Sequence, residues 1–275
     1  MGLRITTNMA SMASQRALSA QTKRQEHASQ ALASGSRIVH ASDDAAGLAI
    51  SEGMKSEIRG TAAAKSNAQN AISAIQVGEG GLSEVSNLLI RLRELGVQSA
   101  SDTLGDKERS YLQQESGSII NEIDRISKTT KFGDKNLLDG SQPTFEFQVG
   151  ASAGKENVVT FTSSGSATVS NLGIEGADIS DKSGARDLLN SVDTALEQVS
   201  KMRAGFGAIQ SRLESTTNGL DVRSENLSSA RSRIADADIA KESSDLASAS
   251  VLQNAAVSVL AQANQQPGVA MKLIG

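Results

Sequence analysis

A long heptad stripe is the feature that most constrains how this chain can fold. Stepping by four and three residues in turn from Leu188 to Ile234 meets apolar side chains, with breaks only at Thr216 and Arg223. Such spacing, kept over about six heptads, predicts one long α-helix that packs against other helices. We predict that the seam of this helix is formed by Leu188, Val192, Val199, Met202, Phe206, Ile209, Leu213, Leu220, Leu227 and Ile234.

The length of this helix predicts an elongated molecule. A helix from about Ala185 to Ile234 would be about 75 Å long, at about 1.5 Å per residue. A compact globule of 275 residues has a diameter of only roughly 50 Å. Because the helix does not fit inside such a globule, we predict a rod.

The first half of the chain offers partner helices for the rod. Apolar positions predict one helix over residues 48–99 and another over 106–130. The sequence "GEGG" at 78–81 predicts a kink, since glycine is unfavourable inside a helix. The segments "TFEFQV" (144–149) and "NVVTFT" (157–162) alternate as strands do, which predicts a β-hairpin.

The two ends of the chain have a different composition. All aromatic residues lie between Tyr111 and Phe206, and residues 246–275 contain a single charged side chain, Lys272. Small apolar residues recur at both ends, but the C-terminal pattern does not continue the phase of the long stripe. We therefore expect joints near 235–243 and 34–44, with two terminal helices paired beyond them.

The predicted fold class is mainly α: a long antiparallel helical bundle or coiled-coil rod with a small β-hairpin region and paired terminal helices. We expect residues 1–40 and 240–275 to form a terminal coiled-coil domain. Residues 41–239 would form the rod domain, with the hairpin region near 131–180. The apolar residues expected to mediate assembly of the terminal domain are Ile5, Met9, Met12, Leu18, Leu32, Leu246, Ala249, Leu252, Ala256, Val259 and Ala263.

Such terminal helices predict self-association. A helix of about 25 residues with small apolar side chains is marginally stable alone in water. Pairing two of them still leaves apolar faces exposed, and other copies of the chain could cover these faces. Heterologous contacts that do not close into a ring propagate as fibres. A homopolymer is therefore the function that composition favours.

Composition argues against several other classes of function. The net charge is −4 and no segment concentrates Lys and Arg, which argues against nucleic-acid binding. No segment reaches about 18 uninterrupted apolar residues, so we expect no membrane insertion. The first residues lack the apolar core of a secretory signal peptide.

Catalytic and metal-binding patterns are missing from the sequence. The chain has no cysteine, and its two histidines, His27 and His40, do not form an HExxH motif. The Gly-x-Ser-x-Gly elbow is absent, and "GEGG" lacks a P-loop lysine. We read Asp43 and Asp44 as helix-terminal residues, with Ser42 or Asp43 capping a helix that begins near Ala45. We predict no enzyme activity and no catalytic, cofactor-binding or metal-binding residues.

Several long segments resemble one protein family. The chain is similar to bacterial flagellin over about 1–140 and 180–275, with the hairpin region as the variable part. The resemblance rests on "ASGSRIVHASDDAAGLAISEGM" (33–54), "RLRELGVQSAS" (91–101), "NEIDRIS" (121–127), "RSRIADADIAKESSDLAS" (231–248) and "VLQNAAVSVLAQANQQP" (251–267).

The resemblance implies a structural subunit of the bacterial flagellar filament, the propeller for swimming. The termini would form an inner tube, and the subunits would be exported to the extracellular flagellum without a cleaved signal peptide. The implied partners are other copies of the chain, the flagellar secretion chaperone, the filament cap and the hook–filament junction proteins. The host Toll-like receptor for flagellin is a further implied partner, because Arg91, Leu95 and Glu115 match the receptor-contact positions of the family.

Two alternative functions compete with the filament subunit. A hook–filament junction adaptor shares the terminal helices but would be present in few copies. A membrane-active translocator would insert its apolar end, which the amide side chains between Gln253 and Gln266 make unfavourable.

Overall fold

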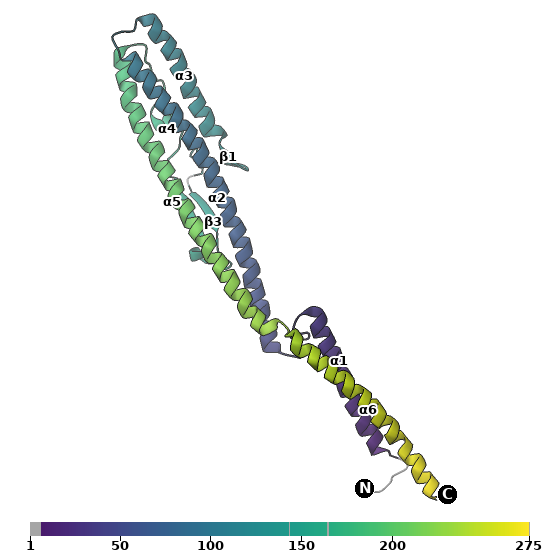
Figure 1. The fold of residues 1–275 in the computed structure, drawn as a ribbon. Helices are drawn as coiled ribbons and strands as arrows, with labels where there is room; N and C mark the ends of the chain where they lie inside the picture. The colour runs from purple at the N-terminus through teal and green to yellow at the C-terminus, as the bar shows by residue number, and fades with distance from the viewer. Residues whose placement is uncertain (1–6, 143, 164, 275) are drawn as a thin grey trace. The chain divides into compact units, whose positions relative to one another are not determined.

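The fold is mainly helical, as predicted, and the chain forms two compact units. The computed structural model describes residues 7–142, 144–163 and 165–274. Unit 1 comprises Met1–Ile58 and Asn226–Gly275, and unit 2 comprises Arg59–Glu225. The helices are α1 (Met9–Ser34), α2 (Ala45–Ser99), α3 (Asp106–Thr129), α4 (Val169–Leu172), α5 (Lys182–Ala235) and α6 (Ile239–Ile274), which Figure 1 shows.

Small antiparallel sheets complete unit 2. Strands β1 (Lys131–Phe132) and β2 (Lys135–Asn136) form one hairpin, and β3 (Thr144–Gln148) and β4 (Val158–Thr162) form the other. In the second hairpin Phe145 lies opposite Phe161, and a short 3₁₀ helix, η1 (Lys155–Asn157), precedes β4. The hairpin predicted at 144–149 and 157–162 is therefore confirmed.

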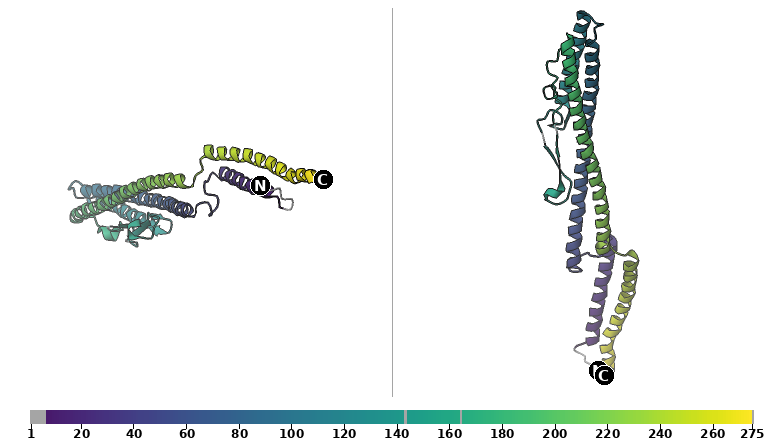
Figure 2. Two further views of the ribbon diagram at one scale, coloured as in Figure 1. Left: turned by 90° about the horizontal axis from the view of Figure 1, so that it is seen from below. Right: turned by 90° about the vertical axis from the view of Figure 1, so that its left-hand side faces the viewer.

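Helices α2 and α5 run side by side through unit 2 and form its core (Figures 1 and 2). On α5, the stripe from Leu188 to Leu213 is buried, with at most 6% of any side chain exposed at its apolar positions. On α2 the fully buried residues recur at three- and four-residue spacing, which matches the heptad geometry of α5. The large ones are Leu82, Val85, Leu89, Leu92 and Leu95.

The seam is less buried toward the C-terminal end of α5. Leu220 is still buried, whereas Leu227 and Ile234, both in unit 1, are half-buried. Helix α3 and the hairpins cover the other end of the seam: Ile119 and Ile123 of α3 and Phe145 of β3 belong to the same core as Leu213. A pair of helices without such a third layer buries fewer of its apolar side chains.

The four residues at 78–81 do not interrupt α2, and the kink expected there stays a prediction. The helix is continuous from Ala45 to Ser99. A Cβ atom on Gly78 would lie 2.9 Å from Cε2 of Phe206, and one on Gly81 would lie 2.8 Å from Cδ1 of Leu138. These glycines are therefore explained by close packing: they let neighbouring core side chains approach the backbone of α2.

Three ion pairs join α2 to α5 along unit 2, and their polarity alternates. Lys65 Nζ lies 2.6 Å from Asp221 Oδ1, and Arg93 Nε lies 2.7 Å from Asp193 Oδ1. In both of these pairs the basic residue is on α2. In the third pair, which lies between them along the helix, the acidic residue is on α2: Glu79 Oε1 lies 3.3 Å from Arg203 Nη2. Exposed pairs of this kind add little free energy, but the alternation of charge favours one register of the two helices.

The "GEGG" segment provides a matched pair of substitutions. Overpacking a core costs about 1–3 kcal/mol, which exceeds the roughly 0.5–1 kcal/mol that alanine gains over glycine inside a helix. We therefore expect Gly78→Ala, which would contact Phe206, to lower the free energy of unfolding. Gly80→Ala should raise it, because a Cβ atom there meets nothing within 4 Å. Urea unfolding followed by far-ultraviolet circular dichroism measures both, and equal stabilisation by the two would contradict this account of Gly78.

Candidate assembly interface

Helices α1 and α6 pack against each other within unit 1 (Figure 2). The buried side chains of α1 are small: Ser11, Ser14, Ala28 and Ala31. Ala28 and Ala31 of α1 and Ala249 and Ala263 of α6 are each at most 5% exposed. Small side chains allow two helices to approach closely, but each contributes little apolar area to the contact.

Polar contacts fix the register of this helix pair. The side-chain amide of Asn8 donates to the carbonyl oxygen of Ala263 at 2.8 Å, and Ser11 Oγ donates to Asn264 Oδ1 at 2.7 Å. Asn8 also caps α1, since its Oδ1 accepts from the Ser11 amide. Because one residue serves both purposes, the start of α1 is tied to a defined position on α6.

The structure separates the predicted assembly residues into three groups. Ala249 and Ala263 are buried between α1 and α6. The half-buried residues are Leu18, Leu32, Leu246 and Ala256. The exposed residues are Met9 (60%), Leu252 (48%), Met12 (51%) and Val259 (55%). Ile5 lies outside the described residues.

Two further valines on α6 are exposed and were missed by the heptad pattern. Val251 is 67% exposed and Val257 is 51% exposed. The three-and-four stepping follows only one face of the helix, and these residues lie outside it. A count of apolar residues around the whole helix would have found them, because a helix that is apolar on several faces is normally buried.

Helix α6 is strongly apolar for a helix with so little buried surface. Residues Ile239–Gln266 are long and apolar enough to cross a membrane, by length and composition only, and 11% of their most apolar window is buried. Gln and Asn side chains interrupt this segment, and they oppose insertion into hydrocarbon. The exposed area of α6 is therefore better suited to contacts with protein.

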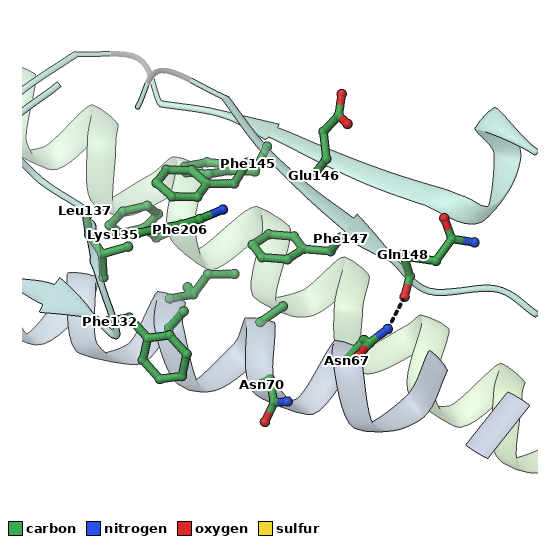
Figure 3. Close-up of a pocket in the computed structure, with 14 residues that line it drawn as sticks. Asn67, Asn70, Phe132, Lys135, Leu137, Phe145, Glu146, Phe147, Gln148 and Phe206 are labelled. Carbon is green, nitrogen blue, oxygen red and sulfur yellow. Dashed lines mark hydrogen bonds between the residues drawn. The ribbon is translucent and has the colours of Figure 1, made fainter. Parts of the chain in front are cut away.

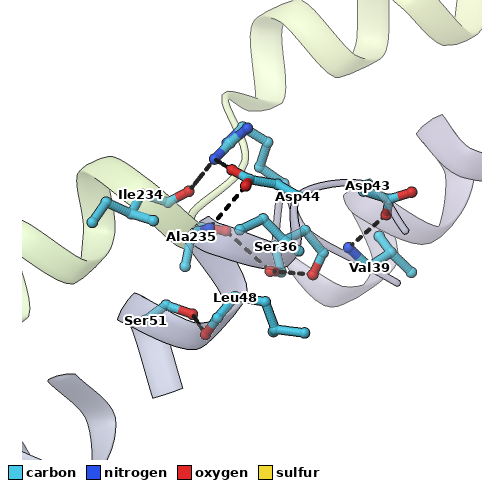
Figure 4. Close-up of polar contacts among 11 residues, drawn as sticks. Ser36, Val39, Asp43, Asp44, Leu48, Ser51, Ile234 and Ala235 are labelled. Atoms are coloured by element: carbon cyan, nitrogen blue, oxygen red, sulfur yellow. Dashed lines mark hydrogen bonds and ion pairs between the residues drawn. The ribbon is translucent and has the colours of Figure 1, made fainter. Parts of the chain in front are cut away.

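The connection between α1 and α2 packs against the turn between α5 and α6, all within unit 1. Helix α1 ends at Gly35, whose φ of 67° is a left-handed cap that glycine adopts without strain. Ser36 forms a β-bridge with Asp236, and the Arg37 amide donates to the Ala235 carbonyl oxygen at 2.7 Å. The two joints predicted from the sequence thus exist and contact each other (Figure 4).

Asp44 caps α2, which corrects the expectation that Ser42 or Asp43 would do so. Asp44 Oδ1 accepts a 2.8 Å hydrogen bond from the Gly47 amide, in the first turn of the helix. Asp44 Oδ2 accepts from Arg37 Nη2 at 3.2 Å. The hydrogen bond from Gly47, followed by the contact with Arg37, lowers the pKa of Asp44.

Asp43 instead closes the turn that precedes α2. Its Oδ2 accepts hydrogen bonds from the His40 amide at 2.8 Å and the Val39 amide at 3.1 Å. These bonds, the first of them most strongly, lower the pKa of Asp43. His27 of α1 also reaches this carboxylate, with Nε2 3.3 Å from Oδ2. Asp43 is occupied by these contacts and is therefore not the cap.

The predicted contact surface on α2 and α3 is only partly exposed. Arg91 Nη2 lies 2.7 Å from Glu115 Oε1, and Arg91 Nη1 lies 3.0 Å from Glu94 Oε2. These contacts, chiefly the hydrogen bond with Glu115, raise the pKa of Arg91. Leu95 has no exposed area and packs in the core beside Leu92, so it does not contribute to this surface.

The described residues contain no group of three or more His, Cys, Asp or Glu side chains placed to hold a metal ion. The candidate site is a surface for protein contacts, because large apolar residues of α1 and α6 are exposed. Long helices with such termini define a helical structural protein that associates with other chains.

Comparison with known proteins identifies the family. The family model described as "Bacterial flagellin N-terminal helical region" matches residues 5–143, and "Bacterial flagellin C-terminal helical region" matches residues 189–274. The chain is 40% identical to a flagellin of Halalkalibacterium halodurans over 270 residues, covering 98% of this chain and 99% of that protein. This chain belongs to the bacterial flagellin family.

Other comparisons agree with this result. The chain is 39% identical to a flagellin of Bacillus subtilis over 306 residues, covering 99% of this chain and 100% of that protein. Its fold also resembles that of a flagellar hook-associated protein from Vibrio parahaemolyticus, with a TM-score of 0.60 and 16% identity, over 70% of this chain and 100% of the other. At that identity the likeness shows the fold alone.

The joint should become less stable in acid. The folded-state pKa values of Asp43 and Asp44 lie below the ordinary value, so their stabilisation is fully present above about pH 4. It is lost as the pH falls through the lowered values. We expect the thermal midpoint of the natural protein to exceed that of an Asp43→Asn, Asp44→Asn variant near neutral pH and to converge with it in acid. A difference that stays constant down to about pH 2 would contradict this assignment.

Proposed function

We propose that this chain is a structural subunit that polymerises into the bacterial flagellar filament, the propeller for swimming. The observation that carries the proposal is the exposure of apolar side chains on α1 and α6 in the single molecule. Met9, Val251 and Val259 are each at least 55% exposed. Membership of the flagellin family supports the same function.

Covering these side chains with other copies of the chain is energetically favourable. Burial of apolar surface contributes about 25 cal/mol per Å², and the exposed residues of α6 gain little of this within one molecule. A heterologous contact between copies leaves a free surface at each end, so it can continue as a helical fibre. The same argument supports a structural role for the chain rather than a catalytic one.

Family membership supports the finer points of the proposal. Residues 1–40 and 240–275 form the inner-tube domain in this proposal, and 41–239 form the helical rod domain. The subunit is extracellular, in the flagellum, and is exported without a cleaved signal peptide. Its partners besides itself are the flagellar secretion chaperone, the filament cap and the hook–filament junction proteins.

Recognition by the host Toll-like receptor for flagellin is a secondary part of the proposal. Arg91 and Glu115 are exposed and form an ion pair, so they present charge on adjoining helices. Leu95 is buried and could take part only through its support of α2. Contacts between subunits are the primary role of this surface in the proposal.

A hook–filament junction adaptor is the alternative function. The likeness to the hook-associated protein from Vibrio parahaemolyticus shows a shared fold and does not favour either function. The two functions differ in copy number, because a filament subunit is the main component of sheared filaments and an adaptor is a minor one. Quantitative mass spectrometry of sheared filaments separates them.

Charge placed on the exposed apolar face of α6 should prevent assembly without unfolding the subunit. We expect Val251→Asp and Val257→Asp to keep the helix content and thermal midpoint of the monomer, since both residues are exposed there. Neither variant should form filaments, because burying an unpaired carboxylate at a subunit contact is very unfavourable. Electron microscopy after salting-out and seeding provides the measurement.

Ser244→Asp is the matched control for these variants. Ser244 is exposed on the same helix, in a segment that already carries Lys241, Glu242 and Asp245. This variant should assemble as the natural protein does. Normal filaments from Val251→Asp and Val257→Asp would show that this face of α6 is not a subunit contact.

A further inference from the structure

The phenylalanines of this chain gather around one open groove in unit 2. The chain has five phenylalanines, and all of them line a groove of about 380 Å³. We call it the phenylalanine groove; it is lined by Phe132, Phe145, Phe147, Phe161 and Phe206, and by Ala71, Ala74 and Ile75 of α2. Its volume lies in the range of about 300–1,000 Å³ that is typical of binding clefts.

The rings that line the groove contact one another. Phe161 and Phe206 pack with ring centroids 5.1 Å apart, and Phe145 and Phe147 with centroids 6.5 Å apart, so the rings support one another along the walls. Phe132 remains 40% exposed at the rim. Figure 3 shows its ring standing beside α2, while Phe147 projects from β3 toward the same helix. Phe132 is the exposed ring of this wall, whereas Phe145 and Phe206 are buried, and an exposed ring at the edge of an apolar groove is suited to contact another apolar or aromatic side chain.

The aromatic residue outside the groove is itself exposed. Tyr111, the single tyrosine, lies on α3 with 70% of its surface exposed. Tyrosine is one of the residues enriched among the energetic hot spots of protein interfaces, where it fills a pocket of the partner. A projecting ring and an open aromatic groove therefore occur on the same protein.

Tyr111 cannot fill the groove of its own molecule. Along the axis of α3, Tyr111 is about 27 Å from Thr129, the last residue of the helix. Phe132, the groove residue nearest to α3 in the sequence, comes only after Thr129. Figure 1 shows β1, which carries Phe132, at the opposite end of α3 from the beginning of that helix. The ring can therefore reach only the groove of another copy.

We propose that Tyr111 of one copy of this chain inserts into the phenylalanine groove of a neighbouring copy. This contact rests on the proposed function, since it requires a polymer. The Tyr111 ring and the phenylalanine groove are different surfaces of the molecule, separated along α3. The contact between them is therefore heterologous and can repeat from one subunit to the next. It is a second interface, on unit 2, besides the apolar face of α6.

One pair of charges fits this orientation. Glu108 lies three residues before Tyr111 and shares its helix face, and Lys135 lines the groove. Both side chains are exposed, and neither forms an ion pair with another described residue. Insertion of the ring would bring this acid and this base to the same edge of the interface, and a charge pair there favours one orientation over others.

A double-mutant cycle on the full chain tests the contact. The readout is the critical concentration for growth of filaments from natural seeds. We expect Tyr111→Ala to raise it about tenfold or more, and Phe132→Ala to raise it as well, since a hot-spot ring and its partner are removed. The double variant should be no worse than the worse single variant. Tyr111→Phe keeps the ring and should stay within about twofold of the natural protein.

A disulfide crosslink gives a direct test, because the chain has no cysteine. Filaments grown from an equal mixture of Tyr111→Cys and Asn67→Cys subunits should form crosslinked pairs on mild oxidation, since Asn67 lines the groove. Tyr111→Cys mixed with Lys201→Cys, at an exposed position of α5 outside the groove, is the control and should give no such pairs.

The outcomes distinguish this contact from the proposed function. Filaments that show neither a crosslink at Asn67 nor any coupling between Tyr111 and Phe132 would overturn the contact and leave the filament subunit intact. Absence of filaments from the natural chain, with seeds present, would overturn both. Circular dichroism of the monomers checks that Phe132→Ala folds, and the rim position of that ring favours this.

Discussion

The small size of the side chains between α1 and α6 is the constraint on which the rest of the molecule depends. Ala31 and Ala263 are buried there, but one methyl group contributes only about 0.8 kcal/mol on burial. A 26-residue helix such as α1 gains little from its own hydrogen bonds in water. Several larger apolar residues, Met9 and Val251 among them, remain exposed. Unit 1 therefore holds α1 and α6 in register but leaves these side chains available for contacts with other chains.

In unit 2, by contrast, a long apolar seam is buried, and the register of α2 against α5 has to be specified by other contacts. Burial itself is non-directional, so a heptad slip would bury many of the same residues. The alternating ion pairs oppose such a slip: moving α2 by two heptads would place Glu79 opposite Asp221 and Arg93 opposite Arg203. Like charges in those positions repel one another. The pairs thus contribute to specificity more than to stability.

Most of the fold could be predicted from the sequence, because long periodic patterns reflect packing directly. The stripe on α5, the hairpin and the two joints are examples. The packing role of Gly78 could not be predicted, because helix propensity is local whereas Gly78 is explained by Phe206, far away in the sequence. The cap was assigned to Ser42 or Asp43 instead of Asp44, because a run of capping residues offers several candidates and only the Gly47 bond decides. Leu95 matched a contact motif but is buried, since three-residue spacing from Leu92 places it on the core face.

The two candidate interfaces have complementary physical characters. The exposed surface of α6 that includes Val251 and Val257 is apolar, and apolar burial is non-directional, so this surface can supply much of the free energy of association but little orientation. The contact of Tyr111 with the phenylalanine groove involves one ring, one cleft and one charge pair, so it supplies orientation with a smaller area. A polymer that repeats with constant geometry needs both. Division of these roles between unit 1 and unit 2 is consistent with the location of all six aromatic side chains of this chain in unit 2, which carries the smaller contact.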